Sequence, residues 1–247
     1  MPLPVLTAGN IVRLLRATSR CAANEREPMS QSFDEMVWTR PASPRAALLL
    51  AHGAGAAMTS PFMDAMAERL AARAIAVARF EFAFMAARRR GGAKTPPPRA
   101  DRLVGEFLRR IASAAAEAGG LPLLIGGKSL GGRVAAMAAA DSQVAQRAVA
   151  VVCLGYPFHA PGNASDLRLD PLRAARLPVL ICQGDRDPFG SAAEIAGWQL
   201  PATIAVTYLA DGDHDFKPRG RSPATWKGNL DAAADAVAAF AVQVAGR

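Results

Sequence analysis

The segment at residues 121–140, LPLLIGGKSLGGRVAAMAAA, constrains the fold of this 247-residue chain more than any other. An apolar run typical of a buried strand reaches a glycine-rich corner and passes directly into an alanine-rich pattern typical of a helix. Ser129 lies at the corner, inside a match to G-x-S-x-G at residues 127–131. A serine on a tight strand-to-helix turn needs neighbours without Cβ atoms, and the helix start favours negative charge beside it. The segment therefore predicts a nucleophilic serine on a strand–turn–helix.

The letters GGKS also resemble the end of a phosphate-binding loop, G-x-x-x-x-G-K-[ST]. The spacing excludes this interpretation, because Pro122 occupies the position of the first glycine. The intervening residues 123–125 are apolar and strand-like where a cradling loop is required. A Gly-Ser turn without chemistry remains the alternative to a nucleophile elbow.

The rest of the chain alternates short apolar runs with helical patterns. Seven strands are predicted at or near residues 35–39, 46–51, 75–80, 121–126, 148–154, 179–182 and 203–208. Helices are predicted at 60–73, 99–118, after Ser129, at 191–198 and at 225–244. This alternation predicts an α/β fold with a doubly wound, mostly parallel sheet of about seven strands and helices on both faces. The connection at 155–177 is too short for a separate lid domain, and the Arg- and Pro-rich segment 81–98 is expected to be a long irregular loop.

Residues 31–247 are expected to form a single domain after a poorly ordered N-terminal extension at residues 1–30. Met29 stands just before the expected domain start, so the upstream segment can reflect a misassigned start codon; a targeting peptide is the less favoured alternative. No apolar run approaches the roughly 20 residues of a membrane helix, and a cytoplasmic protein without a membrane partner is expected. The three cysteines, Cys21, Cys153 and Cys182, indicate neither a disulfide framework nor a zinc site.

The formal net charge of +8 raises the question of a polyanionic partner. Much of the excess is local, because residues 79–110 hold eight Arg and one Lys against three acidic residues. Few aromatic side chains accompany these cations, and no nucleic-acid-binding motif is present. A solvated basic surface is therefore expected rather than nucleic-acid binding.

Polar residues follow four of the predicted strands, at the sheet edge where ligands of parallel α/β folds bind. His52 follows the second strand, Ser129 the fourth, Asp185 and Asp187 the sixth, and His214 the seventh. Serine, acid and histidine come in the chain order of α/β-hydrolases, which differs from the orders of chymotrypsin and subtilisin. The pattern predicts a serine-hydrolase site that needs neither cofactor nor metal.

Six motifs strengthen this prediction: LLLAHGAG, FEFAFMAARRRGG, GGKSLGGR, LGYPFHAPG, QGDRDPFG and GDHDF, spread over residues 46–217. With them the chain resembles the α/β-hydrolases of the dienelactone-hydrolase-like branch. More narrowly, it is similar to bacterial relatives of the testis-expressed hydrolase-like proteins and of the regulatory subunit of the NSL acetyltransferase complex. The elbow carries Ser where dienelactone hydrolases carry Cys, so that substrate is not implied. Fold resemblance alone does not name the reaction.

The resemblance implies roles for particular residues. Ser129 would be the nucleophile, His214 the base, and Asp187, preferred to the turn residue Asp185, the acid that orients the imidazole. The backbone N–H groups of Ala54 and Leu130 would form the oxyanion hole.

Other polar residues near these motifs have weaker assignments. His52 is expected to shape the oxyanion loop through hydrogen bonds, and His159 to face the substrate or act structurally. Arg88, Arg89 and Arg90 are candidates for binding a substrate anion, and Lys128 adds a fourth positive charge at the elbow. The alternative is that the guanidiniums are solvated or bound to acidic residues of the protein.

The sequence is compatible with two different functions. The first is a serine hydrolase of esterase or thioesterase type that acts on a small acyl substrate through an acyl-enzyme. The second is a catalytically weak or silent hydrolase fold used for binding or as a scaffold, which the resemblance to a regulatory subunit makes credible. Neither the natural substrate nor the oligomeric state follows from the sequence.

Overall fold

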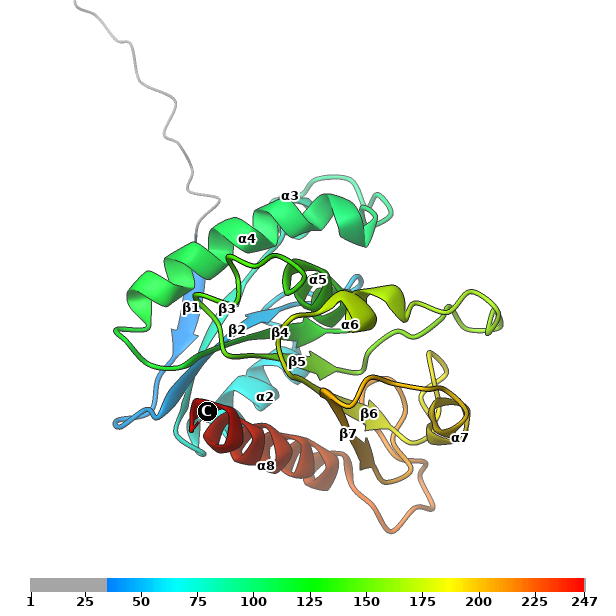
Figure 1. The fold of residues 1–247 in the computed structure, drawn as a ribbon. Coiled ribbons are helices and arrows are strands. Elements are labelled where there is room, and N and C mark those ends of the chain that lie inside the picture. Colours follow the sequence, from blue (N-terminus) through cyan, green and yellow to red (C-terminus); the bar gives the residue numbers. More distant parts are fainter. Residues whose placement is uncertain (1–34, 247) are drawn as a thin grey trace, which may run out of the picture. The chain divides into compact units, whose positions relative to one another are not determined.

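The computed structural model describes residues 35–246, which belong to one compact unit. A seven-stranded sheet with the strand order β1-β3-β2-β4-β5-β6-β7 forms its centre (Figure 1). The strands are β1 (Met36–Thr39), β2 (Ala46–Ala51), β3 (Ile75–Phe80), β4 (Leu123–Lys128), β5 (Ala150–Leu154), β6 (Val179–Gly184) and β7 (Ile204–Leu209). All neighbouring pairs are parallel except the edge strand β1, which pairs antiparallel with β3. The predicted doubly wound, mostly parallel sheet is confirmed.

Helices cover both faces of the sheet (Figure 1). They are α2 (Pro61–Ala71), α3 (Ala83–Arg89), α4 (Ala100–Glu117), α5 (Leu130–Ala138), α6 (Asp170–Ala174), α7 (Ala192–Ala196) and α8 (Trp226–Ala245). The fully buried strand β2 shows why two layers are needed, because successive side chains point to opposite faces. Leu48 and Leu50 pack into the cluster with α2 and α8, whereas Leu49 packs into the cluster with α4 and α5. Each such leucine contributes roughly 1.5–3 kcal/mol by leaving water.

Two helices replace segments that were expected to be irregular. The prediction of a long loop at residues 81–98 was wrong in its first half, where α3 occupies Ala83–Arg89. Its sequence AFMAARR holds strong helix formers and neither Gly nor Pro, and the three prolines begin only at Pro96. The short helix α6 (Asp170–Ala174) likewise interrupts the connection between β5 and β6, with a proline in its first turn.

Two further findings concern the described part of the chain. Cys153 and Cys182 are buried free thiols. No helix within residues 35–246 has the length and apolar character that crossing a bilayer requires. Both Cys21 and the expected extension at residues 1–30 lie outside the described residues.

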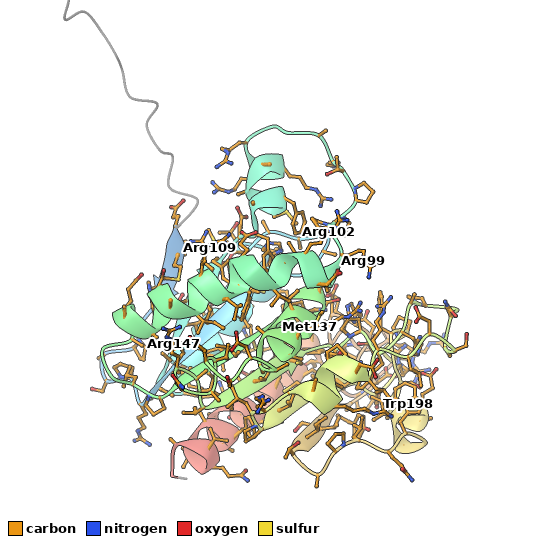
Figure 2. The ribbon with its side chains drawn as sticks, turned by 45° about the horizontal axis from the view of Figure 1, so that its top comes forward. Arg99, Arg102, Arg109, Met137, Arg147 and Trp198 are labelled. Carbon is orange, nitrogen blue, oxygen red and sulfur yellow. The ribbon has the colours of Figure 1, made fainter. Side chains whose placement is uncertain are left out.

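Part of the basic surface lies on the outer side of α4 and at its N-terminus. Figure 2 shows Arg99, Arg102 and Arg109 spaced along this helix, and all three are exposed. Their side chains are on the surface and not in the sheet core, as a solvated basic face requires.

The topology explains where a site can form. Because β2, β4, β5, β6 and β7 run parallel as neighbours, their carboxyl ends reach the same edge of the sheet. The segments that follow β2, β4, β6 and β7 carry the residues predicted to be functional. The fold therefore brings residues from four distant parts of the chain to one edge.

Candidate active site

The turn between β4 and α5 holds Ser129 in a strained conformation. Its φ of 50° and ψ of −112° fall outside the regions that side-chain-bearing residues favour. The glycines permit the close approach, since a Cβ on Gly127 would lie 2.4 Å from a backbone atom of Gly131. A Cβ on Gly131 would lie 2.7 Å from the carbonyl oxygens of Ala51 and His52. The predicted strand–turn–helix geometry around the serine is present.

Ser129, His214 and Asp187 form a continuous chain of hydrogen bonds. The Oγ of Ser129 lies 2.8 Å from Nε2 of His214, and Nδ1 of His214 lies 2.8 Å from Oδ2 of Asp187. An ionised carboxylate can only accept, so Nδ1 carries the proton and Nε2 accepts the hydrogen bond from the serine hydroxyl. This tautomer is the one that a base acting on Ser129 requires.

Asp187 is fully buried, and its carboxylate is held from several sides. Its Oδ1 accepts the N–H of Phe189 at 2.8 Å, and its Oδ2 accepts Nε2 of Gln183 at 2.9 Å. These bonds compensate the cost of burying the carboxylate and orient it toward His214. By contrast, Oδ2 of Asp185 accepts the backbone N–H of Asp211, so this acid braces the turn after β7. Of the two candidate acids, the structure places Asp187 against the imidazole.

The loop after β2 also approaches the serine. Ala54 lines the cavity beside Ser129, and Leu130 opens α5, where first-turn N–H groups have no partner inside the helix. His52 fixes this loop, because its Nδ1 lies 2.6 Å from the carbonyl oxygen of Gly53 and its Nε2 lies 3.1 Å from the backbone nitrogen of Phe82. An amide N–H can only donate, so Nε2 of His52 accepts and Nδ1 donates. Burial lowers the pKa of His52, which keeps the ring neutral.

A cavity of about 500 Å³ opens directly over Ser129 and His214. Its wall combines the loop after β2, the first turn of α2, the elbow and the segment after β7. The lining residues are Gly53, Ala54, Gly55, Ala56, Ser60, Pro61, Phe62, Met63, Lys128, Ser129, Phe189, His214, Asp215, Lys217 and Trp226. This volume suits a small ligand, and most of the lining is apolar.

His159, a predicted substrate-binding residue, does not line this cavity. Its Nδ1 lies 2.9 Å from the carbonyl oxygen of Ala160, and its Nε2 lies 3.3 Å from Oε1 of Glu194. The ring stands edge-on to Trp198, which Figure 2 shows beside α7. The contacts of His159 therefore tie the loop after β5 to α7.

The predicted arginine cluster does not line the cavity either. Arg88 donates to the carbonyl oxygen of Ala54 at 3.3 Å and also to the carbonyl oxygen of Thr95. Arg89 pairs with Glu81 at 2.8 Å, and Arg90 is exposed at the end of α3. The helix α3 carries Arg88 and Arg89 onto these protein partners. Arg88 thus contacts the loop after β2.

The sequence analysis assigned no role to Gln183 and named Lys128 only as a fourth positive charge beside the arginine cluster. Gln183 is the one buried polar side chain of the apolar strand β6 and stands next to its last residue. Its Oε1 accepts the N–H of Tyr156 at 2.8 Å, and its Nε2 donates to Asp187. A polar residue near the end of a buried strand is the sequence signal that could have identified Gln183. Lys128, which precedes the serine, is almost entirely buried and lines the cavity.

The geometry agrees with solved structures of low sequence identity. Est1E from Butyrivibrio proteoclasticus, with ferulic acid bound, is 16% identical, with a TM-score of 0.63 over 86% of this chain and 96% of that chain. A dienelactone hydrolase from Anabaena variabilis is 22% identical, with a TM-score of 0.59 over 85% and 91%. An α/β serine hydrolase without a lid from Xanthomonas campestris is 18% identical, with a TM-score of 0.56 over 82% and 88%. These likenesses show the fold.

Sequence comparison points to the same family. No curated protein sequence matches the chain significantly. The narrower resemblance to the testis-expressed and NSL-complex proteins therefore stays a prediction. A family model described as an alpha/beta hydrolase domain, however, matches residues 44–242, which include Ser129, Asp187 and His214. The chain belongs to the alpha/beta hydrolase family.

Proposed function

We propose that this protein is a serine hydrolase of esterase or thioesterase type that acts on a small acyl substrate. The observation that carries the proposal is the hydrogen-bond chain from Ser129 through His214 to the buried Asp187, at the base of a cavity of about 500 Å³. The order of these hydrogen-bonded groups supports the proposal, because acyl transfer by a serine uses the same arrangement. Esterase neighbours such as Est1E support the reaction class by analogy only.

The acylation half-reaction follows from the geometry. Oγ of Ser129 attacks the carbonyl carbon of the substrate while its proton passes to Nε2 of His214, 2.8 Å away. Negative charge develops on the carbonyl oxygen, where the N–H groups of Ala54 and Leu130 would stabilise it. The carboxylate of Asp187 stabilises the imidazolium that forms. Collapse breaks the bond to the alcohol or thiol, which takes the proton from His214 and leaves the acyl group on Ser129.

Deacylation repeats the sequence with water. His214 accepts a proton from a water molecule, whose oxygen attacks the acyl-enzyme carbonyl. Collapse of this second intermediate returns the proton from His214 to Oγ of Ser129 and releases the carboxylic acid. The side chain of His214 is 19% exposed, so water can reach this position, and no separate lid domain is present among residues 35–246.

Labelling with a fluorophosphonate tests the proposal against a silent hydrolase fold. The probe phosphonylates an activated serine, so it should label the wild-type protein and leave Ser129→Ala unlabelled. Ser113→Ala, which removes an exposed hydroxyl from α4, is the matched control and should be labelled like the wild type. Turnover of 4-nitrophenyl acetate should fall by roughly 10⁴–10⁶ in Ser129→Ala. An unlabelled wild type would favour the scaffold alternative, and a labelled Ser129→Ala variant would refute the assignment of the nucleophile.

A further inference from the structure

Lys128 places a buried cation inside the catalytic cavity. It is the last residue of β4 and directly precedes Ser129, and only 8% of its side chain is exposed. The alternation of β4 directs it to the face covered by α2, where its Nζ lies 5.4 Å from the centre of the Phe62 ring. The side chain lines the cavity together with Ser129. A lysine is almost never buried to this degree without a partner for its charge.

The ammonium lies beside the reacting groups. Gly155 has no side chain, and a Cβ built there would lie 3.3 Å from Nζ of Lys128 and 3.3 Å from Nδ1 of His214. The two nitrogens are therefore at most 6.6 Å apart, twice the 3.3 Å distance. Lys128 and Ser129 line the same cavity, so a small substrate bound at Ser129 would have Lys128 in its surroundings.

The carboxylate that the protein offers to Lys128 is an imperfect partner. Oδ1 of Asp215 lies 3.4 Å from Nζ, longer than the roughly 2.7–2.9 Å of a good charge-assisted hydrogen bond. The side chain of Asp215 is 53% exposed, so water competes for it. Burial lowers the pKa of Lys128, whereas Asp215 and Asp187 oppose that shift. The ammonium can therefore bind a second carboxylate beside that of Asp215, or bind one in its place.

From these contacts we infer that Lys128 selects substrates whose acyl group carries a carboxylate, namely half-esters or half-thioesters of short dicarboxylic acids. The inference rests on the proposed hydrolase function and names its substrate class. A carboxylate fits the position because the side chain of Asp215 already reaches it. The rings of Phe62 and Trp226 and the side chain of Met63 line the space that the connecting methylene groups would occupy. Recognition of substrate charge thus belongs to Lys128 and not to the arginines of α3.

The test compares two esters of equal chain length. 4-Nitrophenyl hemiglutarate carries a carboxylate at the end of a five-carbon acyl chain, and 4-nitrophenyl valerate lacks it. The Ser129→Ala variant supplies the background for both, because a neighbouring carboxylate also assists spontaneous hydrolysis. A hydrogen bond to a charged group is worth roughly a tenfold to hundredfold preference. Wild type should therefore show a kcat/KM for the hemiglutarate at least about tenfold above that for the valerate.

Three variants assign the preference to Lys128. Lys128→Met keeps an unbranched apolar side chain and removes the charge, so the ratio of the two kcat/KM values should fall by at least about tenfold. Lys227→Met is the matched control, because it removes an exposed lysine charge from the first turn of α8, outside the cavity lining. Its ratio should equal that of the wild type. Asp215→Asn removes the competing carboxylate and should raise the ratio.

The outcomes separate the inference from the proposed function. If wild type hydrolyses neither ester above the Ser129→Ala background, the proposed function fails, and the inference falls with it. If it hydrolyses both and Lys128→Met leaves the ratio unchanged, the function stands and the inference is wrong. An equal fall of the ratio in Lys227→Met would assign the preference to the general positive field instead. Should Lys128→Met not fold, Asp215→Asn decides, and a lowered or unchanged ratio in that variant overturns the inference.

Discussion

Two imidazoles at the same sheet edge show how differently one residue type is used in this molecule. His52 follows β2 and His214 follows β7, and in both rings Nδ1 donates and Nε2 accepts. The ring of His52 lies between the carbonyl oxygen of Gly53 and the amide of Phe82. His214 instead bridges a carboxylate and a hydroxyl. The tautomers match, but the hydrogen-bond partners differ.

The partners decide what each ring can do. A backbone amide does not give up its proton to an imidazole, whereas a serine hydroxyl does so while attacking a carbonyl. His52 is fully buried, and burial lowers its pKa, so it does not gain charge near neutral pH. The side chain of His214 is 19% exposed, lines the cavity and faces the carboxylate of Asp187. The hydrogen-bond partners of His52 and His214, and not the residue type, therefore determine what each ring can do.

Replacing His214 with alanine should produce the largest effect on activity. The proposed base and the return path for its proton both disappear, so kcat for 4-nitrophenyl acetate should fall by roughly 10⁴-fold or more. The free energy of unfolding should change little, because the ring is partly exposed to the cavity. Steady-state kinetics and chemical denaturation measure the two quantities. A fall in kcat of less than tenfold would mean that the hydrogen bond to Ser129 is not part of the reaction.

Gln183→Met should give the next largest effect on activity by releasing Asp187. The amide of Gln183 donates to Oδ2 of Asp187, the same oxygen that accepts from His214. Without this donor the carboxylate loses part of its orientation, and kcat should fall by about tenfold. The amide N–H of Tyr156 also loses its acceptor, at a cost of roughly 1–3 kcal/mol in unfolding free energy.

A positioning role for Gln183 predicts more than lost stability. The pH profile of kcat should shift, since the surroundings of the carboxylate that orients His214 change. Gln143→Met, at an exposed glutamine beyond α5, is the matched control and should leave both kcat and its pH profile as in wild type. A destabilised Gln183→Met protein with an unchanged kcat and pH profile would assign Gln183 to the fold alone.

The fold could be predicted from the sequence because its signals are local and repeated. The apolar run Ala46–Ala51 is buried at every position, and β3 has the bounds expected from its pattern. The glycines around Ser129 predict a tight corner, and the structure has one there. The helix α3 shows the limit of such local signals. An arginine run and three prolines predicted a loop, although the short stretch before the prolines consists of good helix formers.

The site could be predicted only in part, since burial and partners of charged groups depend on tertiary contacts. The order of Ser129, Asp187 and His214 along the chain was informative, and the structure brings these residues together. The sequence does not show that Arg89 on α3 pairs with Glu81. It also does not show that Lys128 is buried in the lining of the cavity. Three neighbouring arginines are conspicuous in a sequence, yet a charge acts more strongly on its neighbours where burial has removed the surrounding water.

His52→Ala should weaken the fold more than the chemistry. Removal of the ring leaves the amide of Phe82 without its acceptor, which costs roughly 1–3 kcal/mol in unfolding free energy. Folding holds the pKa of His52 below its ordinary value near 6.5, so the unfolded chain binds a proton first as the pH falls. The contribution of His52 is therefore complete above that value and declines below it. Denaturation at pH 7.5 and 5.5 should show a larger difference between wild type and variant at pH 7.5. A difference that grows on acidification would contradict a neutral, buried His52.

The smallest effect is expected for the third imidazole. His159 contacts the carbonyl oxygen of Ala160, the carboxylate of Glu194 and the ring of Trp198, and none of its atoms borders the cavity. His159→Ala should therefore change kcat/KM for 4-nitrophenyl acetate by less than about threefold, against the four orders of magnitude expected for His214→Ala. Loss of the packing against Trp198 should lower the unfolding free energy by roughly 1 kcal/mol. The two variants should be assayed side by side over a range of pH. Comparable losses of activity would show that the loop after β5 reaches the reacting groups, and the division between one proposed catalytic and two structural histidines would have to be abandoned.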